Sequence, residues 1–109
     1  MDGGAEKPIG FDLALAKGHE SDGFRDRAIA IADLLKRIDA GKIQTGESEA
    51  DVEPLLADGV SALGLRTVMT RYWDYHHSQA DTFDKIVPDE FRRCTATMAV
   101  MAYMLADWP

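Results

Sequence analysis

The chain has 109 residues and carries 12 Lys and Arg against 19 Asp and Glu, which gives a formal net charge of −7. This length allows one domain at most, and 46% hydrophobic with 28% charged residues is the composition of a folded globular protein. The acidic balance argues against nucleic-acid binding, because phosphate backbones are bound by clustered Lys and Arg. A single cysteine excludes an internal disulfide and a Cys-rich zinc module.

Large apolar residues at alternate positions predict a strand over residues 9–15. Residues 17–23 then read as a loop, in which Ser21 or Asp22 is placed to cap the next helix. Apolar residues spaced three and four apart predict that helix, and Gly41 ends it as a left-handed cap. Its predicted inward residues are Phe24, Ala28, Ile31, Leu35 and Ile38.

The middle of the chain alternates short apolar segments with turn signals. Residues 42–45 are a possible strand, and residues 46–50 form an acidic linker. Asp51 is expected to cap a short helix that tolerates Pro54 in its first turn and ends at Gly59. Residues 60–65 are apolar and bounded by glycine, which predicts a buried strand.

Residues 66–87 show no sustained period, and long irregular stretches in small domains are commonly functional. Pro88 then opens the last helix, for which we expect no membrane span, because its nearly uncharged part is shorter than the roughly 20 residues required. Its predicted inward stripe is Phe91, Thr95, Met98, Ala102 and Leu105. Cys94 in this helix is predicted to be a packing residue.

Strands alternating with helices predict an α/β fold with a partial sheet of about three strands and three helices. Nothing in the sequence covers the edges of such a sheet. The chain is therefore expected to be part of a larger sheet.

The strongest chemical signal is the histidine pair in the irregular stretch, Tyr75-His76-His77, followed by Asp81. Imidazole and carboxylate together suit zinc, with a nearby aspartate orienting a histidine. The structural alternative is a hydrogen-bonded histidine pair that closes a loop. Catalytic zinc needs about three protein ligands, and this chain has only one further histidine, His19.

The sequence resembles the C-terminus of M28-family zinc peptidases. The resemblance lies in residues 71–88 and 98–107, in residues 50–55 with 59–60, and in the opening Asp2-Gly3-Gly4 and Pro8-x-Gly10-Phe11. The similarity points to the carboxypeptidase Q-like branch and spans essentially the whole chain. It implies the C-terminal part of an α/β/α peptidase domain that uses two zinc ions to hydrolyse short peptides. The family is often secreted or exported.

The resemblance also assigns residues. His77 matches the last zinc-ligand histidine and Asp2 matches an aspartate ligand, whereas His76, Tyr75 and Asp81 take supporting or substrate-side positions. The family's remaining ligands and its paired glutamates have no counterpart in this sequence. We therefore expect weak zinc binding or none, and no activity for this chain alone.

Three readings follow for the chain as it stands. The first is an inactive part of a zinc exopeptidase or dipeptidase that lacks the N-terminal part of its domain. The second is a stand-alone interaction module that forms a homodimer through a sheet edge. The third is complementation, in which a separate N-terminal piece docks and restores a zinc site.

Overall fold

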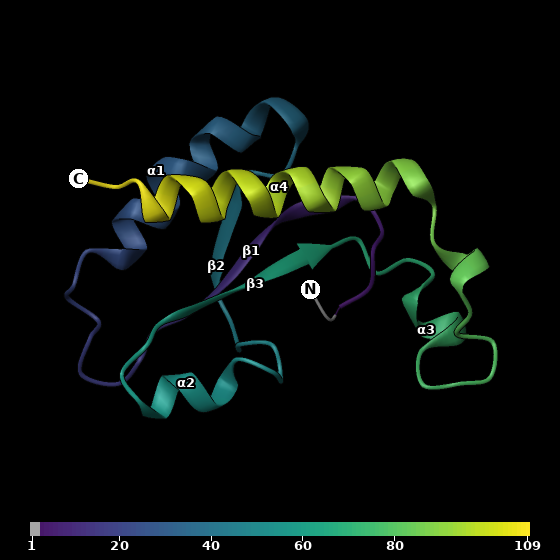
Figure 1. Cartoon of the computed structure of the whole chain (residues 1–109), viewed down its shortest axis with the longest axis horizontal. Helices are drawn as coiled ribbons and strands as arrows, with labels where there is room; N and C mark the ends of the chain where they lie inside the picture. Colours follow the sequence, from purple (N-terminus) through teal and green to yellow (C-terminus); the bar gives the residue numbers. More distant parts are fainter. Residues whose placement is uncertain (1–2) are drawn as a thin grey trace.

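A computed structural model describes residues 3–109, so the predicted ligand Asp2 lies outside the described residues. Three strands form one mixed sheet in the order β2-β1-β3 (Figure 1). They are β1 (Pro8–Ala14), β2 (Lys42–Thr45) and β3 (Ala62–Thr67). β1 runs parallel to β2 and antiparallel to β3. The α/β fold with a three-stranded sheet is as predicted, although β3 begins and ends two residues later than expected.

β1 is the central strand, and it is buried on both faces. Phe11 and Leu13 point to one face, and Gly10 and Ala14 on the other face are also buried. At Gly10 the strand pairing is irregular, and a Cβ there would lie 1.9 Å from the carbonyl oxygen of Lys42. Its φ of 154° also favours glycine, so two independent constraints fix this residue.

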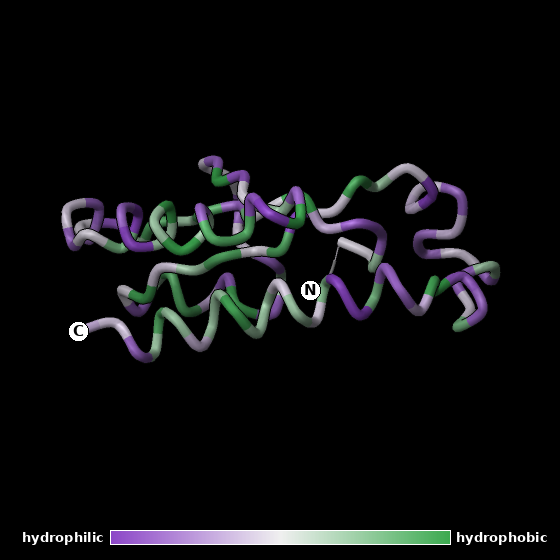
Figure 2. Tube along the Cα trace, turned by 90° about the horizontal axis from the view of Figure 1, so that it is seen from above, coloured by the Kyte–Doolittle hydropathy of each residue, from purple (hydrophilic) through white to green (hydrophobic). Residues whose placement is uncertain are grey.

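Two helices cover the apolar face of the sheet. α1 (Phe24–Leu35) continues into a 3₁₀ turn, and α4 (Pro88–Ala106) lies against both α1 and β1 (Figure 1). Figure 2 shows that the N-terminal half of α4 is hydrophilic and its C-terminal half more apolar. Two shorter helices, α2 (Glu53–Ala57) and α3 (Tyr72–Tyr75), follow β2 and β3. None of the helices in residues 3–109 is long and apolar enough to cross a membrane.

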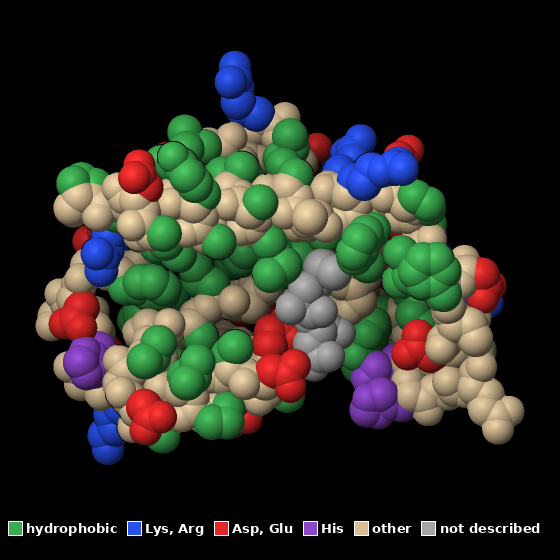
Figure 3. Space-filling view, in the orientation of Figure 1, with side chains coloured by type: hydrophobic (Ala, Val, Ile, Leu, Met, Phe, Trp, Pro, Cys, Tyr) green, Lys and Arg blue, Asp and Glu red, His purple; other side chains and the backbone are tan. Residues whose placement is uncertain are grey.

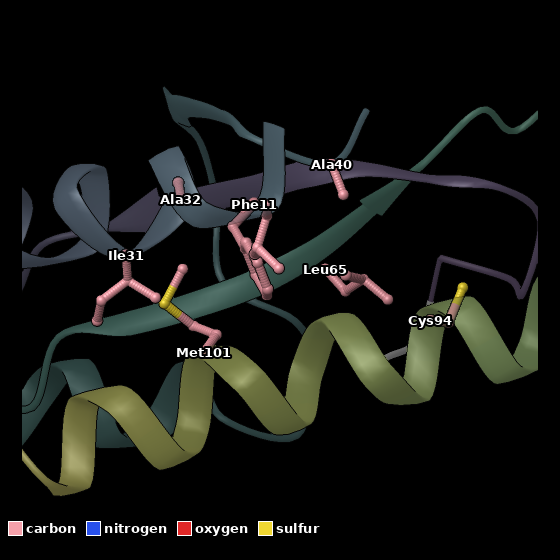
Figure 4. Close-up of a cluster of buried hydrophobic side chains, with 8 residues drawn as sticks. Phe11, Ile31, Ala32, Ala40, Leu65, Cys94 and Met101 are labelled. Carbon is pink, nitrogen blue, oxygen red and sulfur yellow. The ribbon is translucent and has the colours of Figure 1, made fainter. Parts of the chain in front are cut away.

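The core lies between the sheet and these two long helices. Figure 4 shows Ile31 of α1 and Met101 of α4 together near Phe11, with Cys94 farther along α4. The complete cluster is Phe11, Ile31, Ala32, Leu35, Ala40, Leu65, Cys94 and Met101.

The predicted inward stripe of α4 is wrong. The helix buries Cys94, Thr97 and Met101, whereas four of the five predicted residues, all except the half-buried Leu105, are exposed. The polar residue Thr97 can face inward because its hydroxyl donates a hydrogen bond to the carbonyl oxygen of Arg93 at 2.8 Å. Apolar residues lie on several sides of this helix, so periodicity alone selected the wrong side.

The predicted helix caps also need correction. α1 begins after Gly23 with no side-chain cap, so neither Ser21 nor Asp22 acts as one. At its other end the left-handed residue is Asp39, with φ of 60°, rather than Gly41, and Ile38 is exposed. α2 follows Val52 without a side-chain cap from Asp51. These ends are determined by backbone hydrogen bonds and loop geometry.

Candidate functional site

A pocket of about 380 Å³ gathers the residues that the sequence singled out. Tyr75, His76, His77 and Asp81 all line it. Its other walls come from the segment before β1, from α3 and from the start of α4, namely Gly4, Ala5, Tyr72, Ile86 and Phe91. Histidine side chains reach the molecular surface at this end of the molecule (Figure 3). Three distant parts of the sequence therefore meet around the histidine pair.

The two histidines are stacked on each other. Their ring centroids lie 3.9 Å apart with 18° between the planes, and the His76 ring also lies 4.4 Å from that of Tyr72. Both distances are shorter than the roughly 4.5–7 Å that is usual for aromatic pairs, so these rings are in direct contact. The pair thus closes the loop by stacking, which corrects the expected alternative of a hydrogen-bonded pair. His76 is half-buried and His77 is exposed at the pocket.

His77 has an unusual backbone conformation. Its φ is +53°, in the left-handed region that residues other than glycine seldom adopt. α3 ends just before it, where the N–H of His76 donates to the carbonyl oxygen of Tyr72 at 2.9 Å. The chain turns sharply at this residue, and the turn directs the loop back towards the pocket.

Short-range hydrogen bonds shape the loop that carries Asp81. The Ser78 hydroxyl donates to the carbonyl oxygen of Tyr75 at 2.6 Å and accepts from the N–H of Ala80 at 3.2 Å. Asp81 is exposed and its N–H donates to the carbonyl oxygen of Ser78 at 3.1 Å. Serine commonly makes such local bonds in turns, so the loop has a defined path without burying its side chains.

Farther along the loop, Asp84 has a lowered pKa. The ammonium of Lys85 is the largest cause, and the hydroxyl of Thr82 adds to it. Both stabilise the ionised carboxylate. Asp84 does not line the histidine pocket, so we assign its interactions to the loop.

A buried carboxylate that the sequence did not point to lies next to this site. The Glu6 side chain is only 4% exposed, and it accepts hydrogen bonds from the backbone N–H groups of Arg71 at 2.7 Å and Tyr72 at 3.1 Å. The Arg71 guanidinium pairs with both Glu6 and Glu90, and its pKa is raised chiefly by the bond to Glu90. No local sequence pattern marks Glu6, because its partners lie far along the chain.

Cys94 lies beside this network and is a packing residue, as predicted. Its thiol is buried and donates to the carbonyl oxygen of Glu6 at 3.1 Å. Burial raises the pKa of the Cys94 thiol, and the charge of Glu90 raises it further. A thiol with a raised pKa holds little thiolate at neutral pH, which makes it a poor nucleophile.

The described residues do not by themselves fit a zinc site. Residues 3–109 contain no group of three or more His, Cys, Asp or Glu side chains placed to hold a metal ion. Zinc sites in proteins need three or four such ligands. His77 lines the pocket and is one potential ligand. Further ligands are required to complete a site here.

Comparison with known proteins relates this sequence to one family. Residues 1–102 match the model of peptidase family M28. Carboxypeptidase Q from Mus musculus is 29% identical over 77 residues, which cover 71% of this chain and 16% of that protein. Carboxypeptidase Q from Bos taurus is 27% identical over 77 residues, which again cover 71% of this chain and 16% of that protein. No solved structure matches the chain significantly.

The family match covers nearly the whole chain, including the segment before β1, the histidine loop and most of α4. The aligned part nevertheless spans only 16% of the length of these relatives. On the strength of the match over residues 1–102, this chain belongs to peptidase family M28.

Proposed function

We propose that this chain is the C-terminal part of an M28-type peptidase domain that hydrolyses short peptides as an exopeptidase or dipeptidase. The single observation that carries the proposal is the family match, which includes the loop where Tyr75, His76, His77 and Asp81 line one pocket. In this proposal His77 is one zinc ligand and Asp2 is another. His76, Tyr75 and Asp81 contact the substrate or support the ligands.

The isolated chain is proposed to be inactive. Metal-dependent hydrolysis requires a metal-bound water held by a complete ligand set, and residues 3–109 do not provide that set. The missing ligands are proposed to lie in another segment of the domain. A separately produced N-terminal part of the domain should then restore zinc-dependent activity on mixing, and neither part alone should be active.

The ligand assignment is tested by measuring zinc affinity with a competing chromophoric chelator. We expect weak binding to the 109-residue chain and a further loss on His77→Asn. The matched control is His19→Asn, because His19 pairs with Asp22 at 2.6 Å and does not line the pocket. Equal affinity in the native chain and His77→Asn would reject His77 as a ligand. Dipeptide turnover by the native chain that is lost in His77→Asn would reject the proposed inactivity.

A second candidate is an interaction module that forms a homodimer. It is favoured by the sheet, in which the outer edges of β2 and β3 have no partner strand within residues 3–109. It is also favoured by exposed apolar side chains on the long helices, such as Leu34 and Tyr103. Unpaired edges are ready templates for strand addition. A monodisperse dimer by light scattering that is indifferent to zinc would favour this module over the peptidase part.

A further inference from the structure

The buried carboxylate of Glu6 has no role in the proposed function so far. It lies just before β1, and its backbone carbonyl is fixed by the thiol of Cys94 on α4. Burying a charge costs free energy unless it is paired and hydrogen-bonded. Here the cost is offset by two backbone N–H donors and by the Nε of Arg71 at 3.4 Å. An apolar residue would fill the same space without that cost.

The donors to Glu6 lie at the start of the helix that leads to the histidines. Arg71 is the N-cap of α3 and Tyr72 is its first residue, so one carboxylate holds two successive N–H groups of that turn. The Tyr72 ring then contacts His76, and His76 stacks on His77. An unbroken series of contacts therefore runs from Glu6 to the exposed imidazole of His77.

The same carboxylate joins three elements of the pocket. Ala5, adjacent to Glu6, lines the pocket, and so does Tyr72, whose ring packs against the position of Gly4. Arg71 extends the network to Glu90 in the first turn of α4. The positive charge of Arg71 lies between the negative charges of Glu6 and Glu90. This alternation of sign stabilises the ionised form of all three side chains.

We infer that Glu6 is a positioning residue, which fixes the rings of His76 and His77 through Arg71, Tyr72 and α3. The functional importance of this positioning rests on the proposed function, because His77 is a zinc ligand only in that proposal. Glu6 therefore acts on the orientation of the two histidine rings through intervening residues.

The test is NMR of the imidazole C–H groups in the metal-free 109-residue chain, native and Glu6→Gln. Glutamine keeps the oxygen that accepts from both backbone N–H groups, but these bonds lose the negative charge that strengthens them, and its amide nitrogen cannot accept from the Arg71 guanidinium. We expect the His76 and His77 ring signals to lose their ring-current shifts and move towards free-histidine positions, while the methyl signals of Met101 and Leu65 stay in place. His19 is the internal reference, because it lies outside the pocket.

Two further variants keep the inference falsifiable. Asp39→Asn breaks the exposed pair of Lys7 and Asp39 next to the same segment, and it should leave all histidine signals unchanged. If Glu6→Gln fails to fold, Arg71→Gln replaces it, with a smaller shift in the same direction. Unchanged His76 and His77 signals in a folded Glu6→Gln or Arg71→Gln chain would overturn the inference. Because no metal is present, this result does not depend on whether zinc binds.

Discussion

The imidazole of His76 stacks on that of His77 with ring centroids 3.9 Å apart, and it also contacts the rings of Tyr72 at 4.4 Å and Trp73 at 5.3 Å. We propose that His76 supports His77 in the pocket. A flat side chain at position 76 can keep these ring contacts, whereas a small one cannot.

The first prediction concerns this support. His76→Ala should lower the free energy of unfolding by about 1 kcal/mol, because it removes three aromatic contacts, with Tyr72, Trp73 and His77, at a partly exposed site. His76→Phe should retain most of that stability. Urea unfolding followed by circular dichroism measures both. Equal losses in the two variants would show that stacking does not hold the loop.

A second prediction uses the backbone of His77. At φ of +53°, asparagine is tolerated far better than a β-branched residue. His77→Asn should change the free energy of unfolding by less than about 0.5 kcal/mol, whereas His77→Val should cost about 1–2 kcal/mol. Thermal unfolding of the two variants checks this. If His77→Val were as stable as His77→Asn, the left-handed conformation would be wrong.

The third prediction compares two methionines of α4. Met101 is 3% exposed and belongs to the core, whereas Met98 is 39% exposed. Met101→Ala should therefore lower the free energy of unfolding by about 2–5 kcal/mol. Met98→Ala is the matched control and should change it by less than about 1 kcal/mol. A larger loss of stability in Met98→Ala than in Met101→Ala would instead support the inward stripe that helical periodicity predicted.

These methionines also show how far the sequence determines the fold. Alternation in β1 and the three-and-four steps of α1 predict their elements because each has one clearly apolar face. α4 has apolar residues on several sides and a threonine, Thr97, that faces the core with its hydroxyl bonded to its own helix. Choosing the buried side needs the sheet against which the helix packs.

The residues of the candidate site likewise fall into those that the sequence marks and those that only the fold brings together. The loop residues His76, His77 and Asp81 are close in sequence, so their unusual composition marked them directly. Glu6 carries no such mark, since its partners Arg71 and Tyr72 are brought to it by the pairing of β1 with β3. Asp2 lies outside the described residues, and its role stays a prediction.

The fourth prediction concerns alkaline pH. Burial raises the pKa of Cys94 in the folded chain above its ordinary value of about 8.5. The protonated thiol therefore adds stability below the unfolded pKa, and that stability is lost as the pH rises through the folded pKa. Between pH 8 and pH 10 the native chain should lose more unfolding free energy than Cys94→Ala. Parallel curves for the two chains would contradict this.

The last prediction concerns the close approach of the parallel strands β1 and β2 at Gly10. An added methyl group would meet the carbonyl oxygen of Lys42 at 1.9 Å, and this oxygen is backbone that cannot move aside. Gly10→Ala should therefore destabilise the chain by about 3 kcal/mol or more, or prevent folding. Gly3→Ala is the control, because a methyl group there meets no atom within 4 Å. Similar melting temperatures for the two variants would mean that β1 and β2 do not approach as closely at Gly10 as described.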